Sequence, residues 1–133
     1  MVVPHVTGYD LNAELNGITL SYDDLGDGFC PVIFLHGFPF NKDTWQVQME
    51  YLKNHYRVIA IDIRGFGNSK DEKSELSIDL FSDDLITFMD YLDIECAIIC
   101  GLSMGGYISL NAMDRYSHSF TGAILRDTQS PSD

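Results

Sequence analysis

The sequence predicts an α/β fold: a mostly parallel sheet of about six strands, with an antiparallel hairpin at its N-terminal end and three flanking helices. Two observations lead to this prediction. Short apolar runs rich in β-branched residues alternate with longer segments whose apolar residues recur at helical spacing, which is typical of βαβ units. The chain also begins with two half-apolar runs around Asn16-Gly17, a dipeptide that favours a tight hairpin turn.

The elements are expected in a simple order along the chain. The hairpin covers residues 9–25. Four continuously apolar runs then predict parallel strands that are covered on both faces, at residues 32–35, 58–61, 97–99 and 123–125. Helical spacing of apolar residues predicts crossover helices at residues 44–54, 77–92 and 104–116. No repeat or linker interrupts this pattern, so residues 1–133 are expected to form one domain.

Composition and charge limit the classes of function. Of the 133 residues, 45% are apolar, which is enough for a single globular core. Eight basic residues against 20 acidic ones give a net charge of −12, which opposes binding to nucleic acid or to an acidic membrane. Half of the acidic residues lie between Asp62 and Glu95, where we expect most of them on a solvated helix face. With no apolar run long enough to span a membrane, a cytoplasmic protein is expected.

The three cysteines are Cys30, Cys96 and Cys100. They lack the spacing of a metal site, so no metal and no cofactor is expected, and we interpret them as reduced core residues. A catalytic thiol at Cys100 is an alternative, but a buried strand position would raise the pKa of its thiol.

The strongest motif is Gly101-Leu102-Ser103-Met104-Gly105, which fits G-x-S-x-G. It follows a predicted strand and precedes a predicted helix. Such a sharp turn strains the backbone and projects the Ser103 hydroxyl above the sheet, while the glycines allow close packing. The free N–H groups of the helix point to the same place.

A second motif, His36-Gly37-Phe38-Pro39, follows the first parallel strand. A backbone N–H of this loop can converge with that of Met104 on a developing oxyanion. We expect His36 itself to anchor the loop by side-chain hydrogen bonds. Phe38, Phe40 and Trp45 are candidates for an apolar acyl pocket, although packing between loop and helix explains them equally well.

With a third motif, Asp62-Ile63-Arg64-Gly65-Phe66-Gly67-Asn68-Ser69, the chain resembles the N-terminal half of an α/β-hydrolase of the esterase or enol-lactonase type. The resemblance covers residues 9–127. It implies that Ser103 is the nucleophile and that Phe38 and Met104 supply the oxyanion N–H groups. The third motif is interpreted as a loop-shaping segment whose charges are paired locally.

The resemblance also implies parts that this sequence lacks. Family members place an acid after a later strand and a histidine near the C-terminus, in the order Ser, Asp or Glu, His. The sequence is therefore interpreted as a truncated domain without the C-terminal strands, the lid and the catalytic histidine region. Asp127 and His118 are the possible acid or base, but His118 precedes the last strand and is expected at the opposite end of the sheet.

Three functions remain open at this point. The first is a serine hydrolase for small acyl or ester substrates, weak or dependent on assembly. The second is a non-catalytic module that binds a small ligand, and the third is a split-enzyme half that needs a partner chain. Because residues 122–125 would form an unpaired strand edge, we predict a homodimer through this strand or pairing with a complementary hydrolase half. Antiparallel pairing would bring the partner copy's His118 toward Ser103, although a surface histidine is the simpler interpretation.

Overall fold

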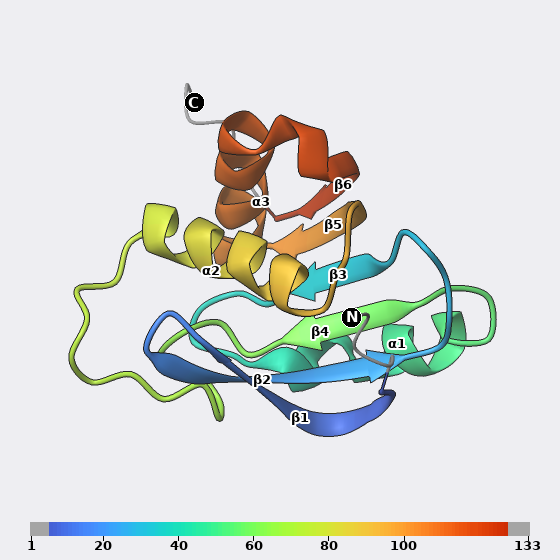
Figure 1. The fold of residues 1–133 in the computed structure, drawn as a ribbon, viewed down its shortest axis with the longest axis horizontal. Helices are drawn as coiled ribbons and strands as arrows, with labels where there is room; N and C mark the ends of the chain where they lie inside the picture. The colour runs from blue at the N-terminus through green and yellow to red at the C-terminus, as the bar shows by residue number, and fades with distance from the viewer. Residues whose placement is uncertain (1–5, 128–133) are drawn as a thin grey trace.

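The computed structural model describes residues 6–127 as one six-stranded sheet with helices on both faces (Figure 1). The strand order is β1-β2-β4-β3-β5-β6. Antiparallel pairing joins β1 to β2 and β2 to β4, whereas β4, β3, β5 and β6 are parallel. The strands are β1 (Gly8–Leu15), β2 (Ile18–Leu25), β3 (Val32–Leu35), β4 (Val58–Ile61), β5 (Ala97–Leu102) and β6 (Phe120–Arg126). The predicted mixed sheet is confirmed.

The hairpin and helix boundaries follow from local chemistry. Asn16 and Gly17 connect β1 to β2 with φ angles of 47° and 82°, which is the conformation expected of this dipeptide. The side chain of Ser77 accepts a hydrogen bond from the Leu80 N–H at 3.1 Å and so caps the first turn of α2. The helices are α1 (Gln46–Leu52), preceded by the 3₁₀ turn η1 (Lys42–Trp45), α2 (Ile78–Tyr91) and α3 (Met104–Arg115), followed by η2 (Ser117–Ser119).

Side chains that alternate along the strands build two apolar layers. Ile33 and Leu35 of β3 face α2 and α3, whereas Phe34 between them packs against Trp45 and Met49 on the side of α1. The same alternation occurs in β4 and β5, because successive strand side chains point to opposite faces. The central strands are therefore buried on both sides. Among residues 6–127, no helix combines the length and apolar character needed to cross a bilayer.

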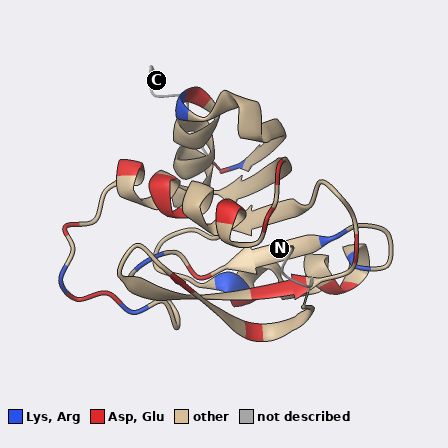
Figure 2. Cartoon of the chain, viewed as in Figure 1, with Lys and Arg blue, Asp and Glu red and all other residues tan. Residues whose placement is uncertain are grey.

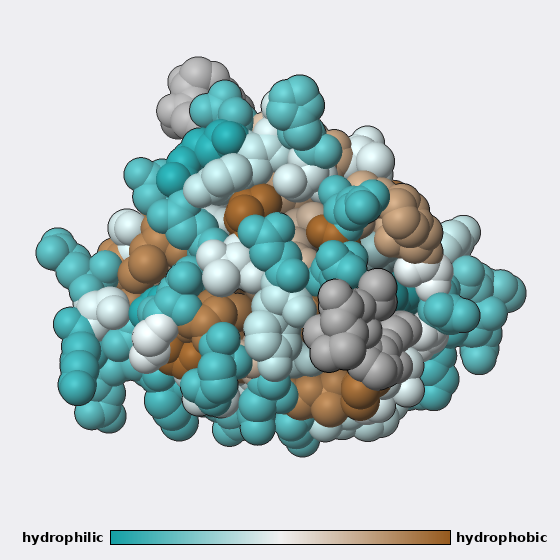
Figure 3. Space-filling view, viewed as in Figure 1, coloured by the Kyte–Doolittle hydropathy of each residue, from teal (hydrophilic) through white to brown (hydrophobic). Residues whose placement is uncertain are grey.

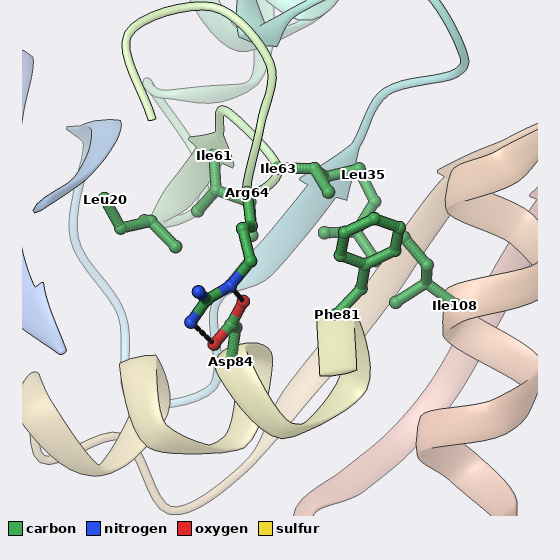
Figure 4. A pocket seen from close by; sticks show the side chains of 8 residues that line it. All are labelled: Leu20, Leu35, Ile61, Ile63, Arg64, Phe81, Asp84 and Ile108. Carbon is green, nitrogen blue, oxygen red and sulfur yellow. Dashed lines mark hydrogen bonds and ion pairs between the residues drawn. The ribbon is translucent and has the colours of Figure 1, made fainter. Parts of the chain in front are cut away.

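The acidic residues are less solvated than the sequence predicts. Figure 2 shows acidic bands along α2, but Asp84 of α2 is only 2% exposed and forms a two-point ion pair with Arg64 at 2.7 and 2.9 Å. This pair lies beside an apolar cavity of about 10 Å³ between the sheet and α2 (Figure 4). Arg64 needs a buried carboxylate there, which overrides the polar-face interpretation for this residue.

Two other expectations are corrected by the surroundings of the strands. The apolar run of β6 is not covered on both faces: Ile124 is 57% and Leu125 is 40% exposed. Elsewhere, hydrophilic side chains cover much of the surface seen in Figure 3. Of the cysteines, only Cys100 is buried in the core, whereas Cys30 and Cys96 are half-buried just before β3 and β5.

Candidate active site

Ser103 occupies the sharp turn between β5 and α3. Its backbone adopts φ 55° and ψ −111°, a conformation that costs free energy in a residue with a side chain. The Ser103 N–H donates to the carbonyl of Arg126 at the end of β6 at 2.9 Å, which fixes the turn against the neighbouring strand. The side chain is exposed at the carboxyl edge of the parallel strands. This geometry presents the Ser103 hydroxyl to an approaching molecule.

The two glycines of the motif are required by close backbone packing. A Cβ on Gly105 would lie 2.2 Å from the carbonyl oxygen of Leu35, and one on Gly101 would lie 2.3 Å from the carbonyl oxygen of Gly105. Neither position can hold a side chain without movement of the backbone. The glycines thus let α3 begin directly against β3 and β5, with Ser103 above the junction.

The loop after β3 lies against the same turn. A Cβ on Gly37 would be 3.3 Å from the Cβ of Ser103, so the following residue, Phe38, starts close to the serine. The Phe40 N–H donates to the Gly37 carbonyl at 2.9 Å and closes this loop. On the other side of Ser103, Met104 is the first residue of α3, where a backbone N–H has no acceptor in a preceding helical turn. Two backbone segments therefore flank the Ser103 side chain.

His36 is a structural residue of this loop. Its Nε2 accepts the Ile63 N–H at 3.0 Å, which leaves Nδ1 to donate to the Gly37 carbonyl at 2.9 Å. The side chain is fully buried, and burial lowers the pKa of the imidazole below its usual value. Both ring nitrogens are occupied, so this histidine ties two loops together and has no nitrogen left for proton transfer.

The third sequence motif forms the neighbouring loop. The carboxylate of Asp62 accepts the N–H groups of Lys42 and Asn68 at 2.8 and 2.9 Å. A Cβ on Gly67, which has φ 52°, would lie 2.4 Å from this carboxylate. Asp62 therefore shapes the loop by local hydrogen bonds. Arg64 also reaches Asp71 within the loop at 2.8 Å, as well as Asp84.

The structure brings Asp127 close to Ser103 in the sheet and leaves His118 far away. Leu102 pairs with Arg126, so Ser103 and Asp127 follow neighbouring strands at the same edge. Both have positive φ angles, 55° and 53°. His118 lies exposed in η2 before β6, and the seven residues of this extended strand span about 20 Å between His118 and the Ser103 end of the sheet.

The three aromatic candidates have different surroundings. Phe38 and Phe40 are 68% and 57% exposed, and the Phe38 ring packs edge-on against Phe66 with centroids 5.7 Å apart. Trp45 is only 3% exposed and packs against Phe34 beneath the sheet. For Trp45 this favours the packing interpretation over a place in an open acyl pocket, because its surface is used in core packing.

Sequence reasoning missed the contribution of Asp84 to this region. The carboxylate lies 20 residues from Arg64, and no local spacing links the two. The basic residue in a segment interpreted as loop-shaping is the signal that an acidic partner was needed. Within residues 6–127, no three histidine, cysteine or acidic side chains are arranged to hold a metal ion.

Comparisons with known proteins identify the family and the fold. Residues 31–133 match the profile of the α/β hydrolase fold. The chain is 39% identical over 100 residues to the AB hydrolase superfamily protein YisY of Bacillus subtilis, covering 74% of this chain and 37% of that protein. It is 38% identical over 93 residues to the bifunctional esterase/perhydrolase DCH of Acinetobacter calcoaceticus, covering 68% of this chain and 34% of the relative.

A solved structure is similar over a longer part of the chain. A thermophilic esterase from Thermogutta terrifontis superimposes with a TM-score of 0.81 and 35% identity, over 91% of this chain and 46% of the esterase. The chain thus spans less than half the length of each of these proteins.

Proposed function

Because this chain belongs to the α/β-hydrolase family, we propose that it provides the nucleophile and the oxyanion site of a serine hydrolase that acts on carboxylic esters. The observation that carries the proposal is the strained, exposed Ser103 at the β5–α3 turn. An esterase is among the similar proteins of known structure, and another relative is named as an esterase. These relatives support ester hydrolysis as the chemistry.

The proposed reaction has two halves. The Ser103 oxygen attacks the acyl carbonyl carbon, and its proton passes to a base. The carbonyl oxygen becomes an oxyanion that accepts hydrogen bonds from the backbone N–H groups of Phe38 and Met104. Each such donor contributes roughly 3 kcal/mol to the transition state. The C–O bond to the alcohol then breaks, the alcohol leaves with a proton, and water releases the acid from the acyl-enzyme.

The source of the base distinguishes the leading proposal from its alternative. Of the three histidines in residues 6–127, His36 has both ring nitrogens occupied, and His55 and His118 lie at the amino ends of β4 and β6. This arrangement within residues 6–127 favours slow turnover unless another segment or chain supplies the base. The alternative is a half that binds a small acyl ligand, or awaits a complementary chain that supplies the base.

Reaction with a fluorophosphonate and hydrolysis of an activated aryl ester test the proposal. The parent chain should be labelled at one site and release the aryl alcohol, and Ser103→Ala should lose labelling and at least a factor of ten in rate. Ser117→Ala, which changes an exposed serine at the other end of the sheet, is the matched control. Equal labelling and turnover in the Ser103→Ala protein would exclude Ser103 as nucleophile. Labelling of Ser103 without turnover would favour the binding or split-half alternative.

We also propose that the open edge of β6 pairs with a second copy of this chain. The edge strand carries exposed Ile124 and Leu125, and antiparallel pairing across a two-fold axis would join the edges of β6 that face away from β5. Light scattering should give the mass of a dimer, and Ile124→Lys should shift it toward a monomer. A monomer at all concentrations would contradict self-pairing, and dimerisation only after addition of a complementary half would assign the edge to that half instead.

A further inference from the structure

Two thiols lie side by side at the amino ends of β3 and β5. Val32 pairs with Ile98, and the Ile98 N–H donates to the Pro31 carbonyl at 2.9 Å. The pairing therefore extends beyond the strand and puts Cys30 opposite Cys96. Neighbouring strands are about 4.8 Å apart, within the range of roughly 4.4–6.8 Å between the Cα atoms of a disulfide.

The side chains of this pair also point to the same face. Phe34 and Cys100 belong to the apolar layer on the side of α1. Cys30 and Cys96 are each an even number of residues away along their strands, so their side chains lie on that side as well. The two sulfur atoms are close enough that a hydrogen bond to Cys30 raises the pKa of the Cys96 thiol to about 11.

The surroundings allow a small reagent to reach the pair. Cys30 and Cys96 are both half-buried, and the Cys30 sulfur has one further polar neighbour, the Thr121 hydroxyl at 3.7 Å. Cys100, in contrast, is buried, and burial raises the pKa of its thiol. Accessibility therefore separates the two paired thiols from the third.

We propose that Cys30 and Cys96 form a reversible disulfide by exchange with a low-molecular-weight disulfide such as oxidised glutathione. Cys30 loses its proton to water and attacks one glutathione sulfur, and the first glutathione leaves as a thiolate that takes up a proton. Cys96 then loses its proton and attacks the Cys30 sulfur of the mixed disulfide, which releases the second glutathione. Two protein thiols are oxidised and one small disulfide is reduced to two thiols.

Incubation of the folded chain with oxidised glutathione tests the proposal. The number of reactive thiols per chain should fall from three to one. Peptide mapping should find the peptides that contain Cys30 and Cys96 joined by a disulfide. The cross-link closes a long loop, so the melting temperature should rise by roughly 5 °C or more. Dithiothreitol should reverse both changes. Retention of all three thiols, or stable glutathione on either cysteine of the parent chain, would overturn the proposal.

Single variants identify the two cysteines of the cross-link, because each variant removes the second step. Cys96→Ser should accumulate a mixed disulfide on Cys30, because the second step is removed. Cys30→Ser should likewise stop at a mixed disulfide on Cys96, because the thiol needed for the second step is absent. Cys100→Ala is the matched control and should form the cross-link like the parent chain. An intramolecular disulfide in either the Cys30→Ser or the Cys96→Ser protein would mean that Cys100 takes part, and would refute the assignment of the cross-link to Cys30 and Cys96.

Discussion

Strands β4 and β6 have similar apolar sequences and very different surroundings. All four residues of β4 are buried, because the strand lies between β2 and β3 with helices on both faces. Within residues 6–127, β6 has a neighbouring strand on one side only, and its Ile124 and Leu125 are largely exposed. An apolar run thus indicates that a strand suits a covered position, but the fold decides whether anything covers it. Side chains in the interior of the sheet are packed on all sides, whereas the apolar side chains Ile124 and Leu125 at the β6 edge are exposed.

The difference in stability cost between interior and β6 positions should be largest when a glycine is replaced by alanine. Gly105→Ala puts a Cβ 2.2 Å from the Leu35 carbonyl oxygen in the interior, so the backbone must move. We expect a loss of about 4 kcal/mol or more in the free energy of unfolding, measured by urea denaturation. In β6, a Cβ on Gly122 meets no atom within 4 Å, so Gly122→Ala should leave stability unchanged or raise it by about 0.5 kcal/mol. Similar losses for both variants would remove the distinction between interior and flank.

Replacing one isoleucine in β4 and one in β6 compares the two strands without forcing the backbone to move. Ile59 of β4 is fully buried, and Ile59→Ala should cost about 3–4 kcal/mol in the free energy of unfolding, because it leaves a cavity. Ile124→Ala should cost less than about 1 kcal/mol in dilute solution, since most of that side chain is already in water. The cost at Ile124 should rise with protein concentration if a second copy covers β6. A cost that is large and independent of concentration would mean that the chain itself covers this flank.

Buried and exposed ion pairs provide the next comparison. Arg64 and Asp84 have side chains that are each 3% exposed, whereas those of Arg115 and Asp83 are 33% and 43% exposed. Arg64→Met should therefore cost about 3 kcal/mol, because a charged carboxylate remains buried without its partner. Arg115→Met should cost less than about 1 kcal/mol.

The double variant Arg64→Met with Asp84→Leu identifies the cause of that loss. Removal of both charges should recover part of the stability lost in Arg64→Met, as measured by urea denaturation. A double variant less stable than the single one would mean that other contacts of Arg64, such as the Asn16 carbonyl at 2.9 Å, dominate.

These contrasts also explain how much could be predicted from the sequence. The hairpin turn at Asn16-Gly17 and the strand–turn–helix around Ser103 were predictable, because each depends on residues that are adjacent in the chain. The buried partner Asp84 of Arg64 was not, because it depends on how α2 packs on the sheet. The position of Cys30 opposite Cys96 was not either, because it depends on the order and register of strands. The open edge at residues 122–125 was predicted from the resemblance, whereas the apolar run itself predicted that Ile124 and Leu125 would be covered, because such a run does not reveal what packs on a strand.

The smallest expected effect depends on pH and concerns the buried His36. Its pKa in the folded chain is lowered from 6.5 by burial, so above about pH 6.5 the imidazole is neutral in both states and does not change the stability. As the pH falls below that value, the unfolded chain takes up the proton first, and stability declines by at most about 1.4 kcal/mol per pH unit until the folded chain is protonated too. His36→Asn should be less stable at every pH, because two hydrogen bonds change. Its free energy of unfolding should, however, fall less steeply with decreasing pH, because the titrating imidazole is absent. His118→Gln, at an exposed position on the open flank, should keep the slope of the parent chain. An unchanged slope in His36→Asn would mean that His36 is not the group that links protonation to the packing of the interior.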